Sequence, residues 1–318
     1  MSLRARLTAL RAAASVKHRR FGLGLLTIGI GSTVLMVYVQ HFRMRGFLWG
    51  DDGVFPWQTF ATGGHWIRSL YAICGAAWFH TALYLCGTVV TAAFTLGWRT
   101  RITTVLFWLF TWSLYTRNSF VLDGGDNLIY LLAFYMMFAD CSGAASLDAA
   151  RVRRRSRKRG DTLIAMFHNY AILAMMLQIC LLYFTSGLFK AEGHVWQDGT
   201  AVYYVLRSTE FNLSPLGPLC WRSAAVVTLL TWSTVVFEIS WPFLIWFQKT
   251  RFLVVCGAVL LHAMIGYFMG LAWFSLVMIS AQAVALGDSE YLRAAGVVRR
   301  ALSMVFAQAE PTAVASGR

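Results

Sequence analysis

Charged side chains are scarce in this sequence. They make up 13% of its 318 residues, whereas a soluble globular protein carries about 25%. Acidic residues are the rarer kind, with 14 Asp and Glu against 28 Lys and Arg. Hydrophobic residues reach 58% and mean hydropathy is +0.57. The shortage of charge, together with several long apolar runs, excludes an ordinary soluble domain and predicts a polytopic membrane protein.

Cysteine pairs at recognisable spacings are also lacking. None of the six cysteines forms a CxxC or similar motif, and most of them lie in or beside apolar runs. This pattern excludes a disulfide framework and a zinc site, so no metal is expected. No small-residue cleavage site follows the first apolar run, which is therefore expected to stay as a span rather than to be removed as a signal peptide.

The net charge of +14 does not indicate nucleic-acid binding, because the basic residues lie in short segments between apolar runs instead of on one domain face. They are typical of topology signals, which concentrate on the cytoplasmic side. If the N-terminus is cytoplasmic, 21 of the 28 basic residues fall inside, and Lys190 is among the seven outside. The basic run 151–159 is interpreted in the same way, with binding of anionic lipid as the alternative.

This charge asymmetry predicts an even number of spans in the plasma (inner) membrane, with both termini cytoplasmic. The spans must be helices, because lipid offers the backbone no hydrogen-bond partners. The predicted fold class is therefore an all-α polytopic membrane helix bundle of about eight transmembrane helices, with seven as the alternative. A basic cytoplasmic segment 1–20 precedes the transmembrane domain 21–287, and a cytoplasmic tail 288–318 follows it. The predicted spans are residues 21–39, 66–90, 102–121, 127–141, 163–189, 223–247, 252–268 and 270–287.

Ionisable residues inside the predicted spans are informative, because a charge at mid-bilayer costs about 2.5–3.5 kcal/mol on insertion scales. Glu238, His262 and His80 all lie near the middle of a span. A buried histidine bonded to a carbonyl, or a carboxylate paired for packing, is the structural alternative for each of them. His80 is interpreted as structural, and so are Asp140 and His168 near the cytoplasmic ends.

The run SGLFKAEGHVW places a lysine, Lys190, where the span 163–189 leaves the membrane on the outer side. Helical spacing puts Tyr183, Gly187 and Lys190 on one face, and the glycine leaves room for a flat ligand or another helix. A partly desolvated amine could act as a base or nucleophile. The structural alternative is a lysine whose ammonium group reaches the interface. Arg117 and Asp126, from other outer segments, could converge with it on one pocket.

The stretch HNYAILAMMLQICLLYFTSGLFKAEGHVWQDGTAVYYVLRSTEFNLSPLG resembles the fifth-span region of the vitamin K-dependent gamma-carboxylase family. The larger superfamily is the horizontally transferred transmembrane (HTTM) domain, and the similarity extends over about residues 20–287. It includes RNSFVLDGGDN upstream and VVFEISWPFLIWF and LHAMIGYF downstream. The ordered residues that carry it are Gly187, Lys190, Trp196, Tyr203, Tyr204, Ser214 and Pro215.

This resemblance implies roles for individual residues. Lys190 stands where the carboxylases have the base that deprotonates a reduced quinone, and His262 matches a family histidine. Asp126 stands where the family has another histidine, and an aspartate cannot donate as a neutral imidazole does, so vitamin K chemistry in its known form is in doubt. By length and by its GGDN motif the chain is more similar to the sporulation-delaying protein B group. Those bacterial HTTM proteins are needed, with a partner, to mature an exported peptide toxin.

We therefore expect a site at the extracytoplasmic membrane face that takes part in maturing or modifying an exported, toxin-like peptide. A membrane quinol is the candidate cofactor. The expected partners are the lipid bilayer, the peptide and a second small membrane-associated protein, and nucleic acid is not among them. Two alternatives stay open: a gamma-carboxylase-like enzyme reduced to its membrane domain, and a non-enzymatic peptide transporter or immunity protein. The expected catalytic residues are Lys190, His262 and Asp126, and the expected ligand-binding residues are Arg117, Glu238, Trp196, Tyr183 and Gly187.

Overall fold

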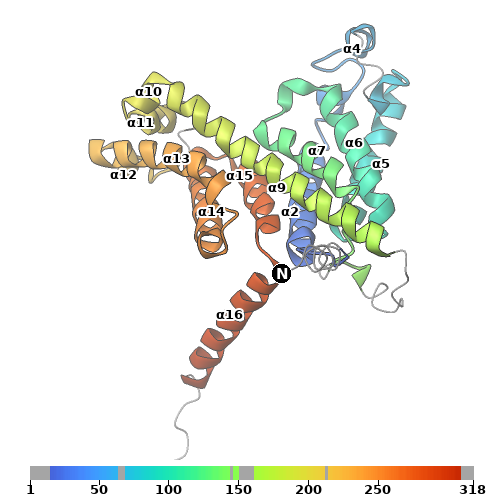
Figure 1. Cartoon of the computed structure of the whole chain (residues 1–318). Coiled ribbons are helices and arrows are strands. Elements are labelled where there is room, and N and C mark those ends of the chain that lie inside the picture. Colours follow the sequence, from blue (N-terminus) through green and yellow to red (C-terminus); the bar gives the residue numbers. More distant parts are fainter. Residues whose placement is uncertain (1–14, 64–68, 144–145, 150–160, 212–213, 309–318) are drawn as a thin grey trace, which may run out of the picture.

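The computed structural model of the chain describes residues 15–63, 69–143, 146–149, 161–211 and 214–308. All regular secondary structure in these ranges is helical (Figure 1), which confirms the predicted fold class. The basic run 151–159, most of the N-terminal basic segment and the last ten residues lie outside the described ranges. The longer helices are α2 (Arg20–Gln40), α5 (Ala77–Thr95), α6 (Thr100–Arg117), α7 (Gly124–Met136), α9 (Asp161–Glu192), α13 (Ala224–Leu244), α14 (Gln248–Met269), α15 (Ala272–Ala281) and α16 (Asp288–Gln308).

Short helices fill the two longest segments between predicted spans, residues 40–65 and 190–222. The first loop contains α3 (Arg45–Trp49) and α4 (Trp57–Thr62). The second contains α10 (His194–Gln197), α11 (Ala201–Arg207) and α12 (Gly217–Trp221). The remaining helical segments are single 3-10 turns: η2 (Leu70–Ala72), η3 (Ser119–Val121) and η4 (Gln282–Ala285).

Five of the described helices, α2, α5, α9, α13 and α14, are long and apolar enough to cross a membrane. A sixth span is possible if the pair formed by α15 with η4 and the start of α16, bent by 105°, counts as one. A helix occupies each of the eight predicted spans, but α7 has only 13 residues and α15 only 10. The span predicted at 66–90 is displaced, since its helix begins only at Ala77. The chain is therefore a helical multi-pass protein with five or six candidate spans.

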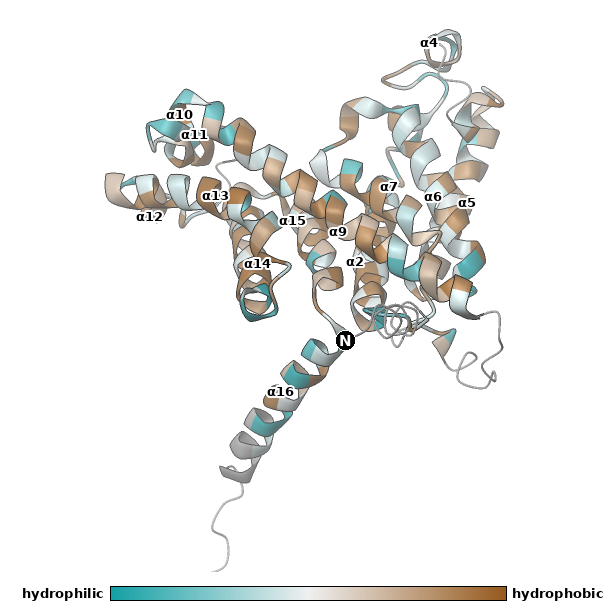
Figure 2. Ribbon diagram, viewed as in Figure 1, coloured by the Kyte–Doolittle hydropathy of each residue, from teal (hydrophilic) through white to brown (hydrophobic). Residues whose placement is uncertain are grey.

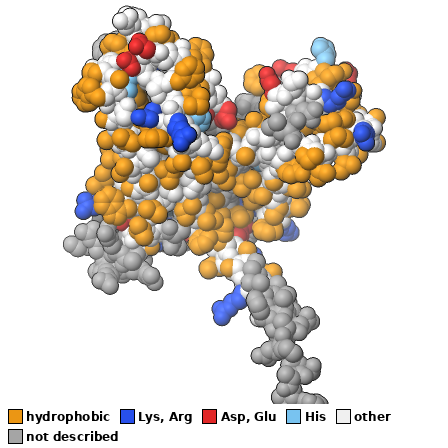
Figure 3. All heavy atoms as spheres, turned by 180° about the vertical axis from the view of Figure 1, so that it is seen from behind, with side chains coloured by type: hydrophobic (Ala, Val, Ile, Leu, Met, Phe, Trp, Pro, Cys, Tyr) orange, Lys and Arg blue, Asp and Glu red, His pale blue; other side chains and the backbone are white. Residues whose placement is uncertain are grey.

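Helix α9 has one exposed apolar face and one face that is buried in the bundle. One face exposes a stripe of large apolar side chains, with 52–66% of each accessible, at Leu163, Phe167, Tyr170, Leu177 and Leu181. These positions recur at helical spacing, so the stripe runs along the helix. Hydrophobic residues are frequent along the long helices (Figure 2), and hydrophobic side chains are spread widely over the visible face (Figure 3), as expected for a bundle that faces lipid. The opposite face of α9 is buried and carries Ala165, Ile172, Met175, Ile179 and Tyr183.

Helix α9 also joins the two sides of the molecule. It crosses the bundle obliquely (Figure 1), packing against α13 on one side and α7 on the other. Helices α13 and α14 and the short helices α10–α12 lie together beyond it, whereas α2, α5, α6 and α7 form the other group. Helix α16 projects away from the body of the bundle. A groove follows from this division, because α9, α13, α14 and α15 enclose it.

Polar side chains fasten the N-terminal segment at the start of α9. Asp140 accepts a charged hydrogen bond from Lys17 and another from Ser142. The ring of His168 accepts from the Asp140 amide at Nδ1, 3.0 Å, and bonds the His18 carbonyl through Nε2 at 2.7 Å. Both ring nitrogens are therefore used by the backbone. This arrangement gives Asp140 and His168 structural roles, in agreement with the interpretation from the sequence.

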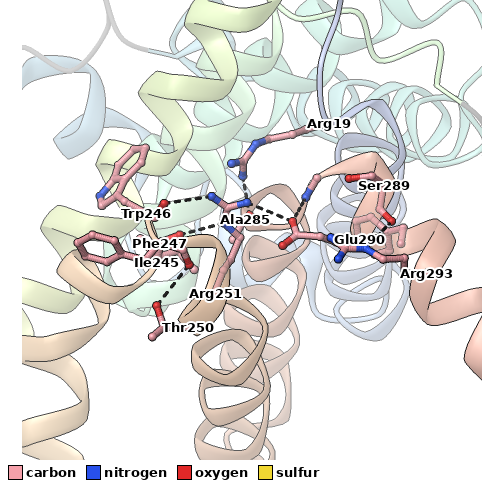
Figure 4. Close-up of polar contacts among 12 residues, drawn as sticks. Arg19, Ile245, Trp246, Phe247, Thr250, Arg251, Ala285, Ser289, Glu290 and Arg293 are labelled. Atoms are coloured by element: carbon pink, nitrogen blue, oxygen red, sulfur yellow. Dashed lines mark hydrogen bonds and ion pairs between the residues drawn. The ribbon is translucent and has the colours of Figure 1, made fainter.

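A second polar cluster joins the N-terminus, α14 and α16 (Figure 4). Arg19 donates to the carbonyls of Val284 and Ala285 at 2.5 and 2.6 Å. Arg251, near the start of α14, donates to the Glu290 carboxylate in the first turn of α16 at 3.2 Å. Burial, followed by the positive charge of Arg251, lowers the pKa of Arg19 to about 10. These contacts fix the sharp bend between α15 and α16.

The Lys17–Asp140 pair predicts a dependence of stability on pH. Burial alone would raise the pKa of Asp140, but hydrogen bonds from Lys17 and Ser142 and the lysine charge lower it from 3.8 to about 2. A lowered folded-state pKa stabilises the protein above the unfolded value, and that contribution disappears as the pH falls from about 4 to 2. Asp140→Asn should therefore cost about 2 kcal/mol at pH 7. Unfolding measured in detergent should show the difference from wild type shrinking over that acid range; a constant difference would contradict it.

Candidate functional site

A pocket of about 510 Å³ lies between α9, α13, α14 and α15, with α10, α11 and α12 closing one end. Its size falls within the usual range for small-molecule sites, about 300–1,000 Å³. Leucine, isoleucine, methionine and phenylalanine side chains make up most of the wall. A few polar groups interrupt this apolar lining, and four of them belong to residues that the sequence analysis singled out: Tyr183, Lys190, Glu238 and His262. The polar groups belong to Tyr183, Ser186, Lys190, Ser233, Thr234, Glu238 and His262.

Lys190 and Glu238 form an ion pair in this wall. The lysine Nζ lies 2.7 and 3.0 Å from the two carboxylate oxygens, and it also donates to Ser186 Oγ at 2.6 Å. The Glu238 side chain is 8% exposed and that of Lys190 is 24% exposed. The indole of Trp196 adds a cation–π contact, with Nζ 5.5 Å from the ring centroid. Lys190 is thus held at the pocket by neighbours on three elements and does not extend freely into solvent.

Gly187 allows the two helices that carry this pair to approach closely. A Cβ atom at Gly187 would lie 2.8 Å from Ile239 Cγ1, 3.0 Å from the Ile239 amide nitrogen and 3.2 Å from Glu238 Cβ. These separations are too short for an ordinary contact. The space beside Gly187 is therefore filled by α13, which settles the alternatives left by the sequence in favour of another helix.

A second polar chain enters the pocket from α9, α14 and the end of α15. The Gln282 amide donates to the Tyr183 hydroxyl at 3.1 Å, and that hydroxyl lies 2.8 Å from His262 Nε2. Since Tyr183 accepts from Gln282, its own proton points to Nε2, and the neutral ring carries its hydrogen on Nδ1. His262 is 3% exposed, and Nδ1 has no partner among the described residues. An unpaired buried donor costs about 1–3 kcal/mol, and because His262 lines the pocket, a ligand whose acceptor oxygen reached Nδ1 would recover that cost.

The ring of Tyr183 is itself held in place. It stacks on Trp241 with centroids 4.7 Å apart and planes inclined by 15°, and both side chains are 1% exposed. Phe274 of α15 meets the edge of His262 at 5.7 Å. The hydrogen-bonding groups of the pocket are therefore oriented by aromatic packing before any ligand arrives.

Two residues expected at this site lie elsewhere. Arg117 is fully buried, and its guanidinium donates to the carbonyls of Phe55, at 2.7 Å, and Gly50 while lying over the Phe60 ring. It thus holds the segment between α3 and α4 against α6. Asp126 lines a separate, smaller cavity at the start of α7. The structure does not bring either residue to the pocket of Lys190.

Three contributors were missed in the sequence. Ser186 lies four residues before Lys190, so helical spacing alone could have placed it beside the amine. Gln282 is a polar residue inside a predicted span, and attention to ionisable residues passed over it. Trp241 gives no sequence signal, because one tryptophan among 13 cannot be assigned to a stacking role without the tertiary structure.

The chain is similar to a known domain family and to individual bacterial proteins. The HTTM domain family matches residues 20–287. The chain is 27% identical over 187 residues to the uncharacterized protein YitO of Bacillus subtilis (strain 168), covering 58% of this chain and 59% of that protein. It is 26% identical over 197 residues to the sporulation-delaying protein SdpB of the same organism, covering 58% of each. The chain thus spans about three fifths of these relatives. No solved structure matches it.

The close approach at Gly187 predicts the effect of one methyl group. Gly187→Ala should force α9 and α13 apart and destabilise the protein by about 1–3 kcal/mol, as overpacking does. Gly296→Ala is the matched control, since Gly296 is also inside a helix and a Cβ there would meet nothing within 4 Å. The control should be neutral or more stable by up to about 1 kcal/mol. Thermal unfolding in detergent distinguishes them, and equal effects would show that the α9–α13 approach is not limiting.

Glu238 is more deeply buried than Lys190, so removing one member of the ion pair should cost more stability than removing the other. Lys190→Met leaves Glu238 buried and unpaired, so it should destabilise by about 3 kcal/mol. Glu238→Gln leaves a lysine that can still reach water, so the loss should be smaller. The double variant should recover part of the loss, with a coupling of about 0.5–3 kcal/mol. Additive effects in this double-mutant cycle would mean that the two groups do not interact in solution.

Proposed function

The chain belongs to the HTTM domain family, and from this premise we propose that it binds a flat, lipid-soluble ligand in the Lys190 pocket and modifies or matures an exported peptide. The resemblance to the sporulation-delaying protein B group is the reason for proposing a toxin-like peptide as the macromolecular substrate. The observation that carries the proposal is the combination of the Lys190–Glu238 pair with an unpaired His262 N–H in one apolar pocket. Such a pocket suits a ring that carries oxygen.

In this proposal His262 binds the ligand, and Lys190 together with Glu238 transfers the proton. His262 donates its Nδ1 hydrogen to a ligand oxygen, and Tyr183 keeps the imidazole in that tautomer. Lys190 takes up a proton released by the ligand after its own proton has passed to Glu238, which lies within hydrogen-bond distance. The surrounding apolar side chains exclude water, which strengthens these electrostatic contacts. Base catalysis is therefore assigned to the lysine–carboxylate pair rather than to an isolated neutral lysine.

A membrane quinol fits this donor set. Its ring would lie against the apolar wall, and its oxygens would meet His262 Nδ1 and Lys190. When bound, such a cofactor supplies an acidic hydroxyl and reducing equivalents.

The membrane topology that goes with this proposal places the Lys190 pocket on the outer side of the plasma membrane and both termini in the cytoplasm. The polar cluster at His168 and the Lys190 pocket lie at opposite ends of α9. The 22 residues between them correspond to about 33 Å of helix, close to the roughly 30 Å thickness of the hydrocarbon core. The shorter helices α6, α7 and α15 complete the proposed eight spans as part of the packed bundle.

Lys190→Arg provides the sharpest test of the base role. Arginine keeps the positive charge and can still bind Glu238, but it stays protonated. We expect the modified peptide to disappear, with a loss of at least about 100-fold for removal of a general base. Mass spectrometry of peptides exported by cells carrying either form is the measurement. Lys249→Arg, at the exposed start of α14, is the matched control and should leave the product unchanged.

The same spectra separate the alternatives. A normal product from Lys190→Arg would exclude the base role. Added carboxylate on the peptide identifies a gamma-carboxylase-like enzyme, while cleavage or another mass change identifies maturation. An unchanged peptide in the presence and absence of the protein would exclude chemistry on that peptide and leave transport or immunity.

A further inference from the structure

A second cavity, of about 140 Å³, lies at the start of α7, between the end of α2, α3, α6 and the start of α15. Asp123 and Asp126 contribute carboxyl groups, and Trp49, Tyr115, Trp273 and Phe274 contribute aromatic rings. We call it the Asp126 cavity. Asp123 and Trp273 are exposed, so the cavity opens to the surface, while Trp49 and Tyr115 are buried at its inner side.

The charge of this cavity opposes that of the chain. Basic residues outnumber acidic ones by 28 to 14 overall, yet the described residues that line this space include two aspartates and no lysine or arginine. His41 is the other titratable residue besides Tyr115, and its Nδ1 is bonded to the Val37 carbonyl at 2.9 Å. The cavity therefore presents negative charge, in a low-dielectric surrounding, to whatever enters it.

The helix cap leaves part of the Asp126 carboxylate available. Asp123 Oδ1 accepts from the amides of Gly125 and Asp126, and Asp126 Oδ2 accepts from the Asp123 amide at 3.0 Å. This reciprocal capping box uses only one oxygen of Asp126. Tyr115 also lines the cavity, and its buried hydroxyl has no hydrogen-bond partner among the described residues. A charged acceptor is thus fixed in position by the cap and still has capacity for a ligand.

The aromatic walls favour an organic cation over a bare ion. Four aromatic residues line the same cavity as the two carboxylates, and an aromatic ring face attracts an ammonium group with about 0.5–2 kcal/mol. A metal ion would require several oxygen ligands, and no cluster able to hold one occurs among the described residues. A primary ammonium group is a cation that carboxylates and aromatic rings can bind together, and it is compact enough for a cavity of this size.

An unpaired donor adds a second requirement. The indole N–H of Trp49 is buried, with the residue 4% exposed, and it has no hydrogen-bond partner among the described residues. A ligand that satisfies it must carry an acceptor oxygen. A ligand that reaches both groups in a cavity of about 140 Å³ needs a positive nitrogen for Asp126 and an acceptor oxygen for the Trp49 N–H.

We infer that the Asp126 cavity binds a primary ammonium group that carries a neighbouring oxygen acceptor. A peptide amino terminus and an ethanolamine headgroup share this chemistry. The inference is independent of any chemistry at Lys190, because Lys190 and Asp126 line different cavities. Gly125 supports the site: a Cβ there would lie 2.9 Å from Asp123 Oδ1 and 3.3 Å from Phe274 Cα, so the glycine lets α15 approach the start of α7 closely.

Binding of small probes to the full-length protein in detergent tests the inference. Glycinamide and ethanolamine should raise the thermal unfolding temperature in a saturable way. Acetylglycinamide and ethylene glycol lack the ammonium group and should not. Asp126→Asn removes the charge but keeps an oxygen for the capping box, so the fold survives while affinity should fall at least about tenfold. Trp49→Phe keeps a ring and removes the N–H, and should weaken binding by a smaller factor.

Asp52→Asn is the matched control, since it removes the same charge from an exposed residue outside the cavity and should leave affinity unchanged. Tighter binding of glycerophosphoethanolamine than of glycinamide would support the site with a lipid headgroup as its occupant, and the reverse order would support it with a peptide amino terminus. Equal binding of the acetylated probe, or unchanged affinity in Asp126→Asn, would overturn the inference.

Discussion

The close packing of α9 on α13 at Gly187 is the constraint on which the pocket depends. Only with these helices in near-backbone contact can the Lys190 amine reach both oxygens of Glu238 from the neighbouring helix. A buried ion pair is weak evidence for stability, because desolvation offsets most of the attraction. Polar groups in a lipid-embedded helix commonly mark function instead. The pair is therefore best understood as part of a binding site that the helix packing makes possible.

The hydrogen bonds of Tyr183 determine which donor the pocket offers besides the ion pair. Tyr183 lies between Gln282 and His262, so its hydroxyl accepts on one side and donates on the other, and a single hydrogen is left on His262 Nδ1. Among the described residues that line the pocket, His262 carries an unpaired donor and Lys190 and Glu238 form a charged pair. A ligand that satisfies both needs an oxygen at each of two places on a rigid body. This requirement, more than the volume, narrows the class of ligand.

Hydrophobic runs and helical spacing were enough to predict the long helices and the face of α9 that lines the site. They did not predict which residues of other helices contact that face. The apolar runs predicted α2, α9, α13 and α14 closely, since length and hydropathy decide a span. The segment before Ala77 is equally apolar yet not part of α5, so composition alone misplaced that boundary. Helical spacing found Tyr183, Gly187 and Lys190. It could not find that Glu238 faces Lys190, because the register of one helix against another is a tertiary property.

Phe274 connects the two cavities of the molecule. Its ring lines both of them, meets the edge of His262 on one side and packs over Gly125 on the other. A packed aromatic ring cannot shift on one side without changing the space on the other, because the protein interior has the density of a solid. A ligand that moves this ring alters both cavities, and thermodynamic linkage makes such an effect reciprocal. Helix α15 is therefore the element through which occupancy of the Asp126 cavity would be felt at His262 and Lys190.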